Sequence, residues 1–598
     1  MRFYPNRQIM NKFRTALCLA AMLPLMGAAQ EENEEQKVSL RGSVQSDILI
    51  PQEDQKIGTG TYDDWALTNT YAELHLLSKY VTAGTRFEFT EFPLPGFEND
   101  FKGWGIPHLY ITGSYKGVEL TAGDFYDQFG SGLIFRTYEE RSLGIDNSLR
   151  GGRLVVKPYK GINIKVLGGQ QRRYWHNRGF GHANRYFDSD DSWVYGADVE
   201  LSFDQWFKKM EEKNTRLTIG LSAVSKHEGN EDIITLRPTG EKDEFGAEQV
   251  GAYKLNLPNN VGAFDVRANL QAGNYSFLAE YAMKGEDPSF DNGYIYRKGS
   301  ALLLSGSYSK RGMSILLQAK RSEDMAYRSV RSGTGTSAFI NHLPAFSMQH
   351  TYALAALYPY ATQNALGEWA FQAELGYNFK RKTLLGGKYG TNIKVNFSHV
   401  RAIDRTPLTD AQGNVATDVI GTKGYESKFF KMGDETYYQD VNVQLEKKLT
   451  RNFKLNLMYM HQRYNKTVVE GHGGMIKSNI AVAEGKYTFN KKFTLRGEAQ
   501  YLHTDQDQGD WWYGLLELSI LPNFMLTVSD MYNANVPNTD ETATSKQHYY
   551  MFSGCYTYKS HRLQLSYGKT RAGYNCSGGV CRYVPASKGV QISYNYNF

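Results

Sequence analysis

The sequence predicts an all-β fold, a single large antiparallel β-barrel that spans a membrane. Three observations predict it: apolar and polar residues alternate with a period of two, short turns and long loops follow one another in turn, and tyrosine and glycine are abundant. The 598 residues include 42 tyrosines, 58 glycines and 16 prolines. Because aromatic residues fit pleated strands and glycine permits tight turns, this composition favours strands over helices.

The alternation recurs along the chain from near residue 38. Successive side chains of a strand point to opposite faces, so an alternating segment has one apolar and one polar face. The clearest examples are 216–222, 264–270, 453–459 and 493–501. A soluble sandwich also alternates but ends after some seven to nine strands, whereas about two dozen segments occur here.

The connections between these segments alternate in length. Tight turns lie near Lys116, Lys160, Lys310, Arg451, Asn490, Pro522 and Ser560. Long loops cover 127–149, 173–192, 226–259, 401–434 and 572–586. Short periplasmic turns and long extracellular loops are typical of outer-membrane barrels, which usually have an even number of strands. We therefore expect about 24 to 26 strands, with 322–434 the hardest region to assign.

The two ends of the alternating region indicate closure. We expect the first strand, which begins near Val38, to pair with the last, since hydrocarbon offers no partner to a free sheet edge. The last segment places Tyr594, Tyr596 and Phe598 on one face. A terminal aromatic residue on such a strand resembles the signal that outer-membrane barrels present to the barrel assembly machinery.

The first 29 residues predict a cleavable signal peptide. Lys12 and Arg14 precede an apolar stretch, and Gly27 and Ala29 provide the small residues before a cut. The expected organisation is a signal peptide (1–29), a short segment (30–37) and a transmembrane barrel (38–598). The expected location is the outer membrane.

Three cysteines follow the signal peptide: Cys555, Cys576 and Cys581. Exported proteins meet oxidising conditions, so a disulfide between Cys576 and Cys581 is expected, closing the small CSGGVC loop. Metal binding by this pair is the weaker alternative, because no histidine cluster lies nearby.

The segment 123–152 is unusually rich in charge. Its charged residues are Asp124, Asp127, Arg136, Glu139, Glu140, Arg141, Asp146 and Arg150, and Arg153 follows directly after it. Folded into the lumen, opposed acidic and basic rows would form a constriction that selects solutes by size and charge. The alternative is an internally paired loop that stabilises the barrel.

Two further groups have aromatic members. The first consists of Arg172, Arg173, Tyr174, Trp175, His176, Arg178, His182 and Arg185. Its basic side chains suit an anionic solute, but an exposed loop that contacts lipopolysaccharide is the preferred interpretation. The second, Trp511, Trp512 and Tyr513, is interpreted as part of an aromatic girdle rather than a sugar-binding platform.

Two stretches carry a family resemblance: GDFYDQFGSGLIFRTYEERSLGIDNSLRGG at 123–152 and HTYALAALYPYATQNALGEWAFQAEL at 350–375. They resemble an uncharacterised family of large, porin-like outer-membrane β-barrels of Bacteroidota, over most of the mature chain. The resemblance implies a barrel of unknown role. It carries no catalytic or ligand-binding residues.

The sequence contains no recognisable catalytic motif. A nucleophile triad, a metal-spaced histidine cluster and a phosphate-binding loop are all missing, and the histidines of 226–230 and 471–474 stand alone. The net charge of +6 is spread along the chain, which argues against nucleic-acid binding. We therefore expect no enzyme activity, cofactor or metal.

The leading functional hypothesis is a porin-like channel with a polar lumen that works without TonB, since only about ten residues separate the signal peptide from the barrel and TonB-driven uptake needs a plug domain. The alternative is a non-transporting scaffold or a component of an outer-membrane assembly or secretion complex. Barrels of this width are filled, by loops or by a partner. Expected partners are outer-membrane lipid, lipopolysaccharide, the barrel assembly machinery and other envelope proteins.

Overall fold

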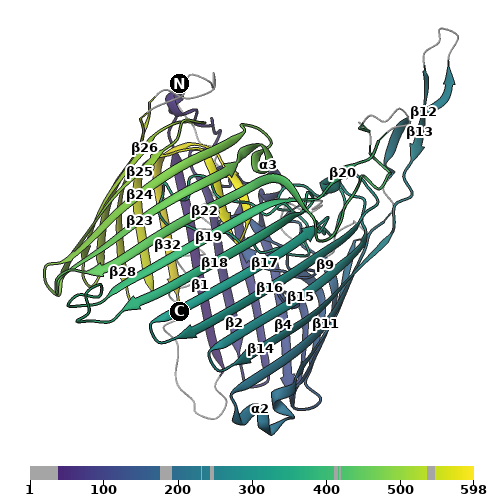
Figure 1. The fold of residues 1–598 in the computed structure, drawn as a ribbon, viewed down its shortest axis with the longest axis horizontal. Coiled ribbons are helices and arrows are strands. Elements are labelled where there is room, and N and C mark those ends of the chain that lie inside the picture. Colours follow the sequence, from purple (N-terminus) through teal and green to yellow (C-terminus); the bar gives the residue numbers. More distant parts are fainter. Residues whose placement is uncertain are drawn as a thin grey trace.

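The computed structural model describes residues 38–175, 192–229, 232–242, 248–409, 415–416, 419–534 and 546–598. The predicted signal peptide and segment 30–37 lie outside these residues. Within them, 24 strands form one antiparallel sheet (Figure 1). The strands of the first half are β1 (Ser39–Pro51), β2 (Leu67–Leu77), β3 (Val81–Thr90), β4 (Gly103–Tyr115), β5 (Val118–Phe125), β8 (Leu149–Val156), β9 (Ile162–Gln171), β10 (Trp193–Ser202), β11 (Thr215–His227), β14 (Asn260–Ala272), β15 (Tyr275–Glu286) and β16 (Lys298–Lys310). Those of the second half are β17 (Met313–Glu323), β18 (Glu368–Phe379), β19 (Thr391–Ile403), β22 (Met432–Lys448), β23 (Phe453–Asn465), β24 (Met475–Thr488), β25 (Phe493–His503), β26 (Trp511–Ile520), β27 (Phe524–Asn533), β28 (His548–Tyr558), β29 (His561–Thr570) and β32 (Ser587–Asn597).

The sheet closes into a barrel because its first and last strands pair. β1 lies antiparallel to β32, with Val44 opposite Tyr596, and the other strands pair with their neighbours along the chain. Gly42 and Phe598 exchange two backbone hydrogen bonds of 2.9 Å at the start of this seam. Each strand of the sheet thus has two partners and no edge is left open. The predicted barrel of 24 to 26 strands is confirmed.

The two rims of the barrel differ as the loop lengths predict. One rim carries short turns, such as 116–117, 273–274 and 559–560, and also η3 (Phe203–Gln205) and α2 (Lys208–Glu212), at the bottom of Figure 1. The other carries the long loops, the longest of which is 324–367. Among the described residues, no helix has the length and apolar character needed to cross a membrane.

Short helices and two-stranded sheets lie within the loops of the long-loop rim. The helical turns there are η1 (Gln55–Ile57), η2 (Asn99–Phe101), η4 (Phe290–Asn292) and α3 (Lys466–Glu470). The two-stranded sheets are β6 (Glu139–Glu140) with β7 (Ile145–Asp146), β12 (Ile234–Lys242) with β13 (Glu248–Lys254), β20 (Thr406–Pro407) with β21 (Tyr425–Glu426), and β30 (Gly573–Ser577) with β31 (Val580–Val584). The β12–β13 hairpin extends far from the barrel (Figure 1).

The wall is apolar outside and largely polar inside, apart from the inward apolar residues that pack against the loops. On β14, the outward Phe264 and Val266 are exposed, whereas the inward Asp265 and Arg267 are buried. A soluble protein places these residue types the other way round. The alternating strands of this barrel therefore present an apolar surface to the surroundings and mainly polar side chains to the lumen.

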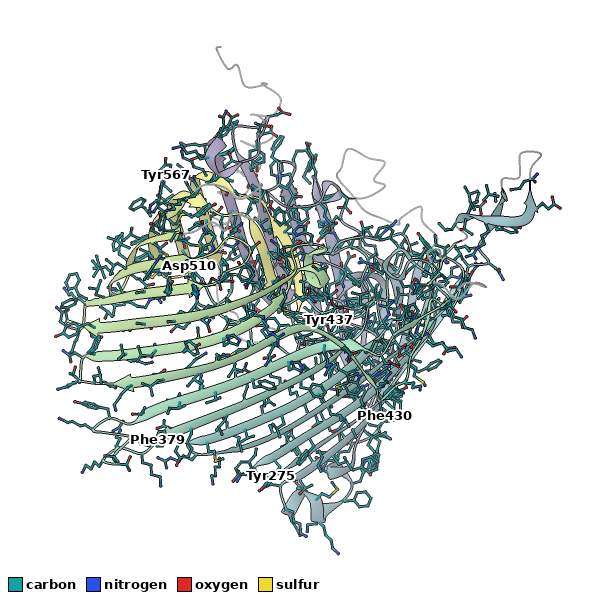
Figure 2. All side chains as sticks on the ribbon, turned by 45° about the horizontal axis from the view of Figure 1, so that its top comes forward. Tyr275, Phe379, Phe430, Tyr437, Asp510 and Tyr567 are labelled. Carbon is teal, nitrogen blue, oxygen red and sulfur yellow. A yellow bond between two sulfur atoms is a disulfide. The ribbon has the colours of Figure 1, made fainter. Side chains whose placement is uncertain are left out.

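Aromatic side chains gather at the short-turn rim, where Tyr275 and Phe379 lie in Figure 2. Their contacts there have ring centroids 4.6 to 5.9 Å apart and join Tyr80–Tyr115, Tyr275–Tyr308, Tyr377–Phe379, Tyr487–Phe489, Phe524–Tyr556 and Tyr596–Phe598. Near the long-loop rim, Trp512 packs on Tyr501 at 4.3 Å on the outer face. Two aromatic zones thus flank the apolar band of the wall.

Candidate functional site in the lumen

Three long loops fold inward and meet inside the barrel. They are 126–148, 324–367 and 571–586, and we call them together the plug. Three backbone hydrogen bonds of 2.9 Å join them: Arg136 to Ile340, His342 to Gly132 and Thr362 to Gly579. The plug is therefore one body made of segments that lie far apart in the sequence.

The plug reaches well-separated parts of the wall. The backbone N–H of Ser131 donates to Glu280 on β15 at 3.1 Å, and that of Leu354 donates to Gln500 on β25 at 2.8 Å. Arg141 donates to the side chain of Gln45 on β1 at 2.9 Å. Because β1, β15 and β25 lie on different sides of the closed sheet, the plug spans the lumen.

The plug has an apolar core of its own. Its buried members include Phe129, Leu133, Ile134, Phe135, Leu343, Phe346 and Leu354. They pack against inward-facing residues of the neighbouring wall, among them Met458, Met460, Ile480 and Val482. Removal of this apolar surface from water favours a folded plug over loose loops.

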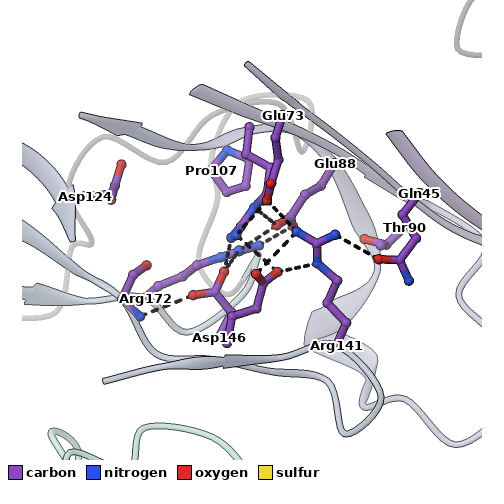
Figure 3. A network of polar contacts seen from close by, with 12 residues as sticks. Gln45, Glu73, Glu88, Thr90, Pro107, Asp124, Arg141, Asp146 and Arg172 are labelled. Carbon is purple, nitrogen blue, oxygen red and sulfur yellow. Dashed lines mark hydrogen bonds and ion pairs between the residues drawn. The ribbon is translucent and has the colours of Figure 1, made fainter. Parts of the chain in front are cut away.

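A network of charged side chains fixes loop 126–148 to the wall (Figure 3). Its members are Glu73, Arg86, Glu88, Glu139, Arg141, Asp146 and Arg172. Arg172 lies 2.6 Å from Glu88, Arg141 lies 2.5 Å from Glu73, and Arg86 and Arg172 both contact Asp146. Since Glu73 and Arg86 belong to β2 and β3, their pairs with Arg141 and Asp146 join the loop to the wall. Arg172, which follows β9, links Asp146 to Glu88.

The guanidinium groups of Arg86 and Arg172 lower the pKa of the acidic residue that they both contact, Asp146. Burial alone would raise the pKa of Asp146, but Arg172 and Arg86 hold this pKa below its ordinary value. Burial raises the pKa of the neighbouring Glu139. Carboxylate oxygens of Glu88, Glu139 and Asp146 lie within 4.8 Å of one another. Arg86 forms an ion pair with all three, so it already supplies the positive charge that a metal ion would bring.

The other predicted constriction residues lie outside this network. Arg150 and Asp124 pair across β8 and β5 at 2.5 Å, and Arg153 lies 3.0 Å from Asp127. The two remaining residues of the predicted constriction, Arg136 and Glu140, make other contacts. Arg136 stacks on the Tyr138 ring at 4.4 Å, and Glu140 accepts a hydrogen bond from the Ser142 hydroxyl at 2.7 Å. The charges of 123–152 are thus largely paired with one another and with the wall.

The second predicted cluster differs from its sequence interpretation. Arg172, Tyr174 and Trp175 are buried, so these side chains do not form an exposed lipopolysaccharide contact. The Tyr174 ring packs edge-on against Phe101 at 5.0 Å. Arg173 is half-buried, and the rest of that cluster, within 176–185, lies outside the described residues.

The predicted girdle at 511–513 is only partly right. Trp512 is 54% exposed on the outer face, whereas Trp511 is 1% exposed and belongs to the internal core. Adjacent strand residues point to opposite faces, so both tryptophans cannot face outward. Tyr513 faces inward with Trp511 and packs against the same core.

The C-terminal loop of the plug is a hairpin closed by a disulfide. Cys576 and Cys581 lie opposite each other on β30 and β31 and are bonded. Cys555, on β28, is buried and free. At the other end of β32, Tyr594 accepts or donates a 2.9 Å hydrogen bond with His561, and the Tyr596 and Phe598 rings stack at 5.4 Å.

A chamber of about 550 Å³ lies between the plug and the wall formed by β1, β2, β29 and β32. Among the residues that line it are Gln45, Gln564 and Ser593 of the wall and Arg571, Tyr574 and Arg582 of the plug. Sequence reasoning identified the loop at 572–586 but missed its arginines. Isolated arginines in a loop carry no local pattern that would identify them.

A smaller cavity of about 370 Å³ lies between residues 345–360 and the β30–β31 hairpin. It is lined by His350, Tyr438 and Asn575, among others. His350 Nε2 lies 3.1 Å from Asp440, which also accepts a hydrogen bond from the Tyr438 hydroxyl. The plug therefore leaves polar space on two of its sides.

The sequence model of one protein family matches residues 10–598, and its description is "Family of unknown function (DUF6029)". No curated protein matches the chain. Among solved structures, the Pseudomonas aeruginosa siderophore receptor PirA is 10% identical, with a TM-score of 0.39 over 94% of this chain and 80% of that chain. Acinetobacter baumannii OccAB3 is 8% identical, with a TM-score of 0.32 over 95% and 100% of the two chains. The P pilus usher (PapC) translocation pore is 9% identical, with a TM-score of 0.35 over 93% and 99%.

Proposed function

Because the chain belongs to this family of unknown function, we propose its role from its own geometry: it is a porin-like channel whose lumen is narrowed by its own loops. Its location is the outer membrane of a Gram-negative envelope, in line with the resemblance to a Bacteroidota barrel family. The long-loop rim is extracellular, and solute crosses by diffusion, without TonB. A cleaved signal peptide at 1–29 directs export.

The outer surface supports a membrane location. Exposed apolar side chains such as Phe264, Leu304 and Leu457 cover the outside of the wall. A water-facing protein rarely exposes an apolar surface of this extent. The aromatic zones at the two rims correspond to the girdles that place barrel residues at the level of the lipid headgroups.

The chamber beside the plug is the observation that carries the channel proposal. The inner faces of β1, β29 and β32 contribute amide and hydroxyl groups to its lining, beside apolar residues such as Leu49. Towards the short-turn rim the lumen is also polar. Arg496, for example, lies 3.0 Å from Glu498 and 3.2 Å from Glu517 on the inner wall. We infer that solute passes through this chamber and along the polar part of the lumen, beside the plug.

The proposed partners follow from this location. Phe598 and the stacked Tyr596 end the seam strand, where they would present a C-terminal signal to the barrel assembly machinery. Outer-membrane lipid would contact the apolar band, and lipopolysaccharide would contact the extracellular rim.

Conductance in a planar lipid bilayer tests the channel proposal. The whole protein is expected to give a small, steady conductance, and replacement of residues 345–360 by a Gly-Ser linker of equal length should raise it several-fold. The same replacement of 234–254, a hairpin outside the lumen, is the control and should leave the conductance unchanged. Sugar flux into liposomes without an energy source tests independence from TonB. The channel proposal would be refuted if neither the whole protein nor the 345–360 variant conducted ions across the bilayer.

One observation favours the alternative, a scaffold or component of an assembly or secretion complex. The projecting β12–β13 hairpin exposes Ile234, Leu236 and Val250, each more than 60% accessible. Their register places them on one face of the hairpin. Exposed apolar faces of this kind mark contact with other proteins.

Affinity purification from native outer membranes tests the scaffold function. If the hairpin binds an envelope protein, the whole chain should retain that protein, and replacement of Ile234, Leu236 and Val250 by asparagine should release it. Replacement of the exposed Tyr253, which lies on the other face of the hairpin, by asparagine is the matched control. A barrel that retains such a partner but gives no conductance in a lipid bilayer would favour the scaffold function over the channel function.

A further inference from the structure

Two half-buried arginines of the chamber, Arg571 and Arg582, differ from the other arginines of the plug region. Arg86, Arg141 and Arg172 each contact carboxylates. Neither Arg571 nor Arg582 forms an ion pair with a carboxylate of the described residues. Both belong to the 571–586 loop, and both line the chamber of about 550 Å³.

The contacts of Arg571 are with carbonyl groups. Its guanidinium donates to the backbone oxygen of Ala572 at 2.8 Å and to that of Leu357 at 3.3 Å. Carbonyl oxygens accept hydrogen bonds but carry no net charge, so no direct contact neutralises the positive charge of Arg571; Asp507 and Glu470 act on it only from a distance. A buried charge is costly unless an opposite charge accompanies it.

Arg582 is only partly satisfied. It donates from Nη2 to the Ser142 oxygen at 3.1 Å and stacks on the Phe97 ring at 3.6 Å. Its Nε and Nη1 atoms are shielded from solvent and have no hydrogen-bond partner among the residues that the structure describes. Burial lowers the pKa of both Arg571 and Arg582, which reflects the same uncompensated charge.

The rest of the chamber suits a hydroxylated molecule. Asp47 is the only carboxylate in its described lining, and it accepts a hydrogen bond from Gln45 at 2.9 Å. Arg141 also lines the chamber, but it is held by Glu73 and Glu139; Figure 3 shows it directed toward Gln45. Amide and hydroxyl groups such as Gln564 and Ser593 are available to bind hydroxyl groups, and Tyr574 offers a ring face.

We propose that the chamber is a binding site for a small anionic sugar, whose carboxylate or phosphate group lies against Arg571 and Arg582. A guanidinium presents paired donors that match the two oxygens of such a group. The volume falls within the range of small-molecule sites, about 300 to 1,000 Å³. This inference deepens the proposed channel function, because it names the class of solute that the route beside the plug would select.

Binding of digalacturonate to the whole protein in detergent, measured by titration calorimetry, tests the proposal. Cellobiose is the uncharged control of similar size, and galactose 6-phosphate tests whether phosphate replaces carboxylate. We expect digalacturonate to bind, cellobiose to bind at least tenfold more weakly, and raised salt to weaken only the anions. Arg571→Gln and Arg582→Gln should each weaken digalacturonate binding about ten- to a hundred-fold, as expected for the loss of a charge-assisted hydrogen bond.

Arg562→Gln is the matched control, because Arg562 lies on β29 outside the chamber lining and donates to Gln564 at 3.3 Å. Circular dichroism and heat-modifiable gel migration show whether each variant folds. Equal binding of digalacturonate and cellobiose, or unchanged binding in both folded arginine variants, would overturn the site. Binding of digalacturonate without bilayer conductance would refute the channel function but support the binding site. Conductance without binding would support the channel function but refute the binding site.

Discussion

Lys320 and Glu368 form an ion pair at the base of the longest loop, with their charged atoms 2.7 Å apart and both side chains fully buried. Lys320 lies near the end of β17 and Glu368 begins β18, so the pair brackets loop 324–367. Lys320 also donates to the Pro344 oxygen at 2.5 Å, and Glu368 accepts from the Gln363 backbone N–H at 2.9 Å and from the Tyr360 hydroxyl. The pair therefore holds both arms of the loop in place.

Removal of one partner of this pair should destabilise the barrel strongly. Lys320→Met or Glu368→Gln leaves a buried charge without its counter-charge, which costs about 3 to 5 kcal/mol. The double variant Lys320→Met/Glu368→Gln should recover part of this loss. Urea unfolding in detergent of the single and double variants measures the coupling. Lys454→Gln breaks a solvent-exposed pair with Glu446 and should cost less than about 1 kcal/mol; equal losses at the two sites would contradict the prediction.

The two faces of β23 should respond differently to a charge. Leu457 is 39% exposed on the outer face, whereas Asn456 points inward and donates to Glu484 at 2.8 Å. Leu457→Arg should cost about 2 to 4 kcal/mol near the middle of the bilayer. Asn456→Arg meets a polar lumen and should be mild. Folding titrations into lipid vesicles measure both, and equal costs would show that the faces are assigned wrongly.

The wall could be predicted from the sequence because its signal is local. A strand alternates with period two wherever it lies, so the seam strand ending at Phe598 and the inward and outward faces of 453–459 are readable from neighbouring residues. The same rule, applied strictly, would have separated Trp511 from Trp512. Sequence analysis instead treated them as one group.

The plug could not be predicted, because its contacts join residues far apart in the chain. Asn341 donates to the Leu133 oxygen at 3.0 Å and to the Met325 oxygen at 2.8 Å, and no periodic pattern marks such a partnership. The charge-rich segment at 123–152 was recognised from composition. Its partners on the wall, Glu73 and Glu88, were not recognised, because nothing in the sequence distinguishes one inward polar residue of a strand from another.

Acid should loosen the plug through His342. This side chain is buried where the three plug loops meet: its backbone N–H donates to Gly132, its ring lies 5.9 Å from that of Tyr138, and Gly578 of the hairpin packs close to it. Burial, together with the charges of Arg136 and Lys320, lowers its pKa to about 3. An undocked loop would have an ordinary histidine pKa near 6.5.

The sign of the pH effect follows from these values. Between pH 6.5 and 3 the undocked loop binds a proton that the docked loop does not, so docking weakens as the pH falls, by about 1.4 kcal/mol per pH unit. Hydrogen-exchange protection factors of 324–367, which correct for the slower intrinsic exchange of amides in acid, should be lower at pH 5 than at pH 7. His342→Gln should remove this difference, and His472→Gln, at an exposed turn, should not. Equal pH dependence in both variants would rule out His342 as the cause.

The disulfide should stabilise the hairpin that carries Arg582. Cys576 and Cys581 are five residues apart, and closing so short a loop is worth about 2 kcal/mol in the chain-entropy model. Reduction, or the double variant Cys576→Ser/Cys581→Ser, should therefore speed hydrogen exchange of residues 573–584 roughly thirty-fold while leaving the wall strands protected. Cys555→Ser is the control, since this buried thiol is free; the reductant should act on this variant as on the natural chain but have no effect on the double variant. Uniform loss of protection across the barrel would mean that the bond supports the whole fold rather than one hairpin of the plug.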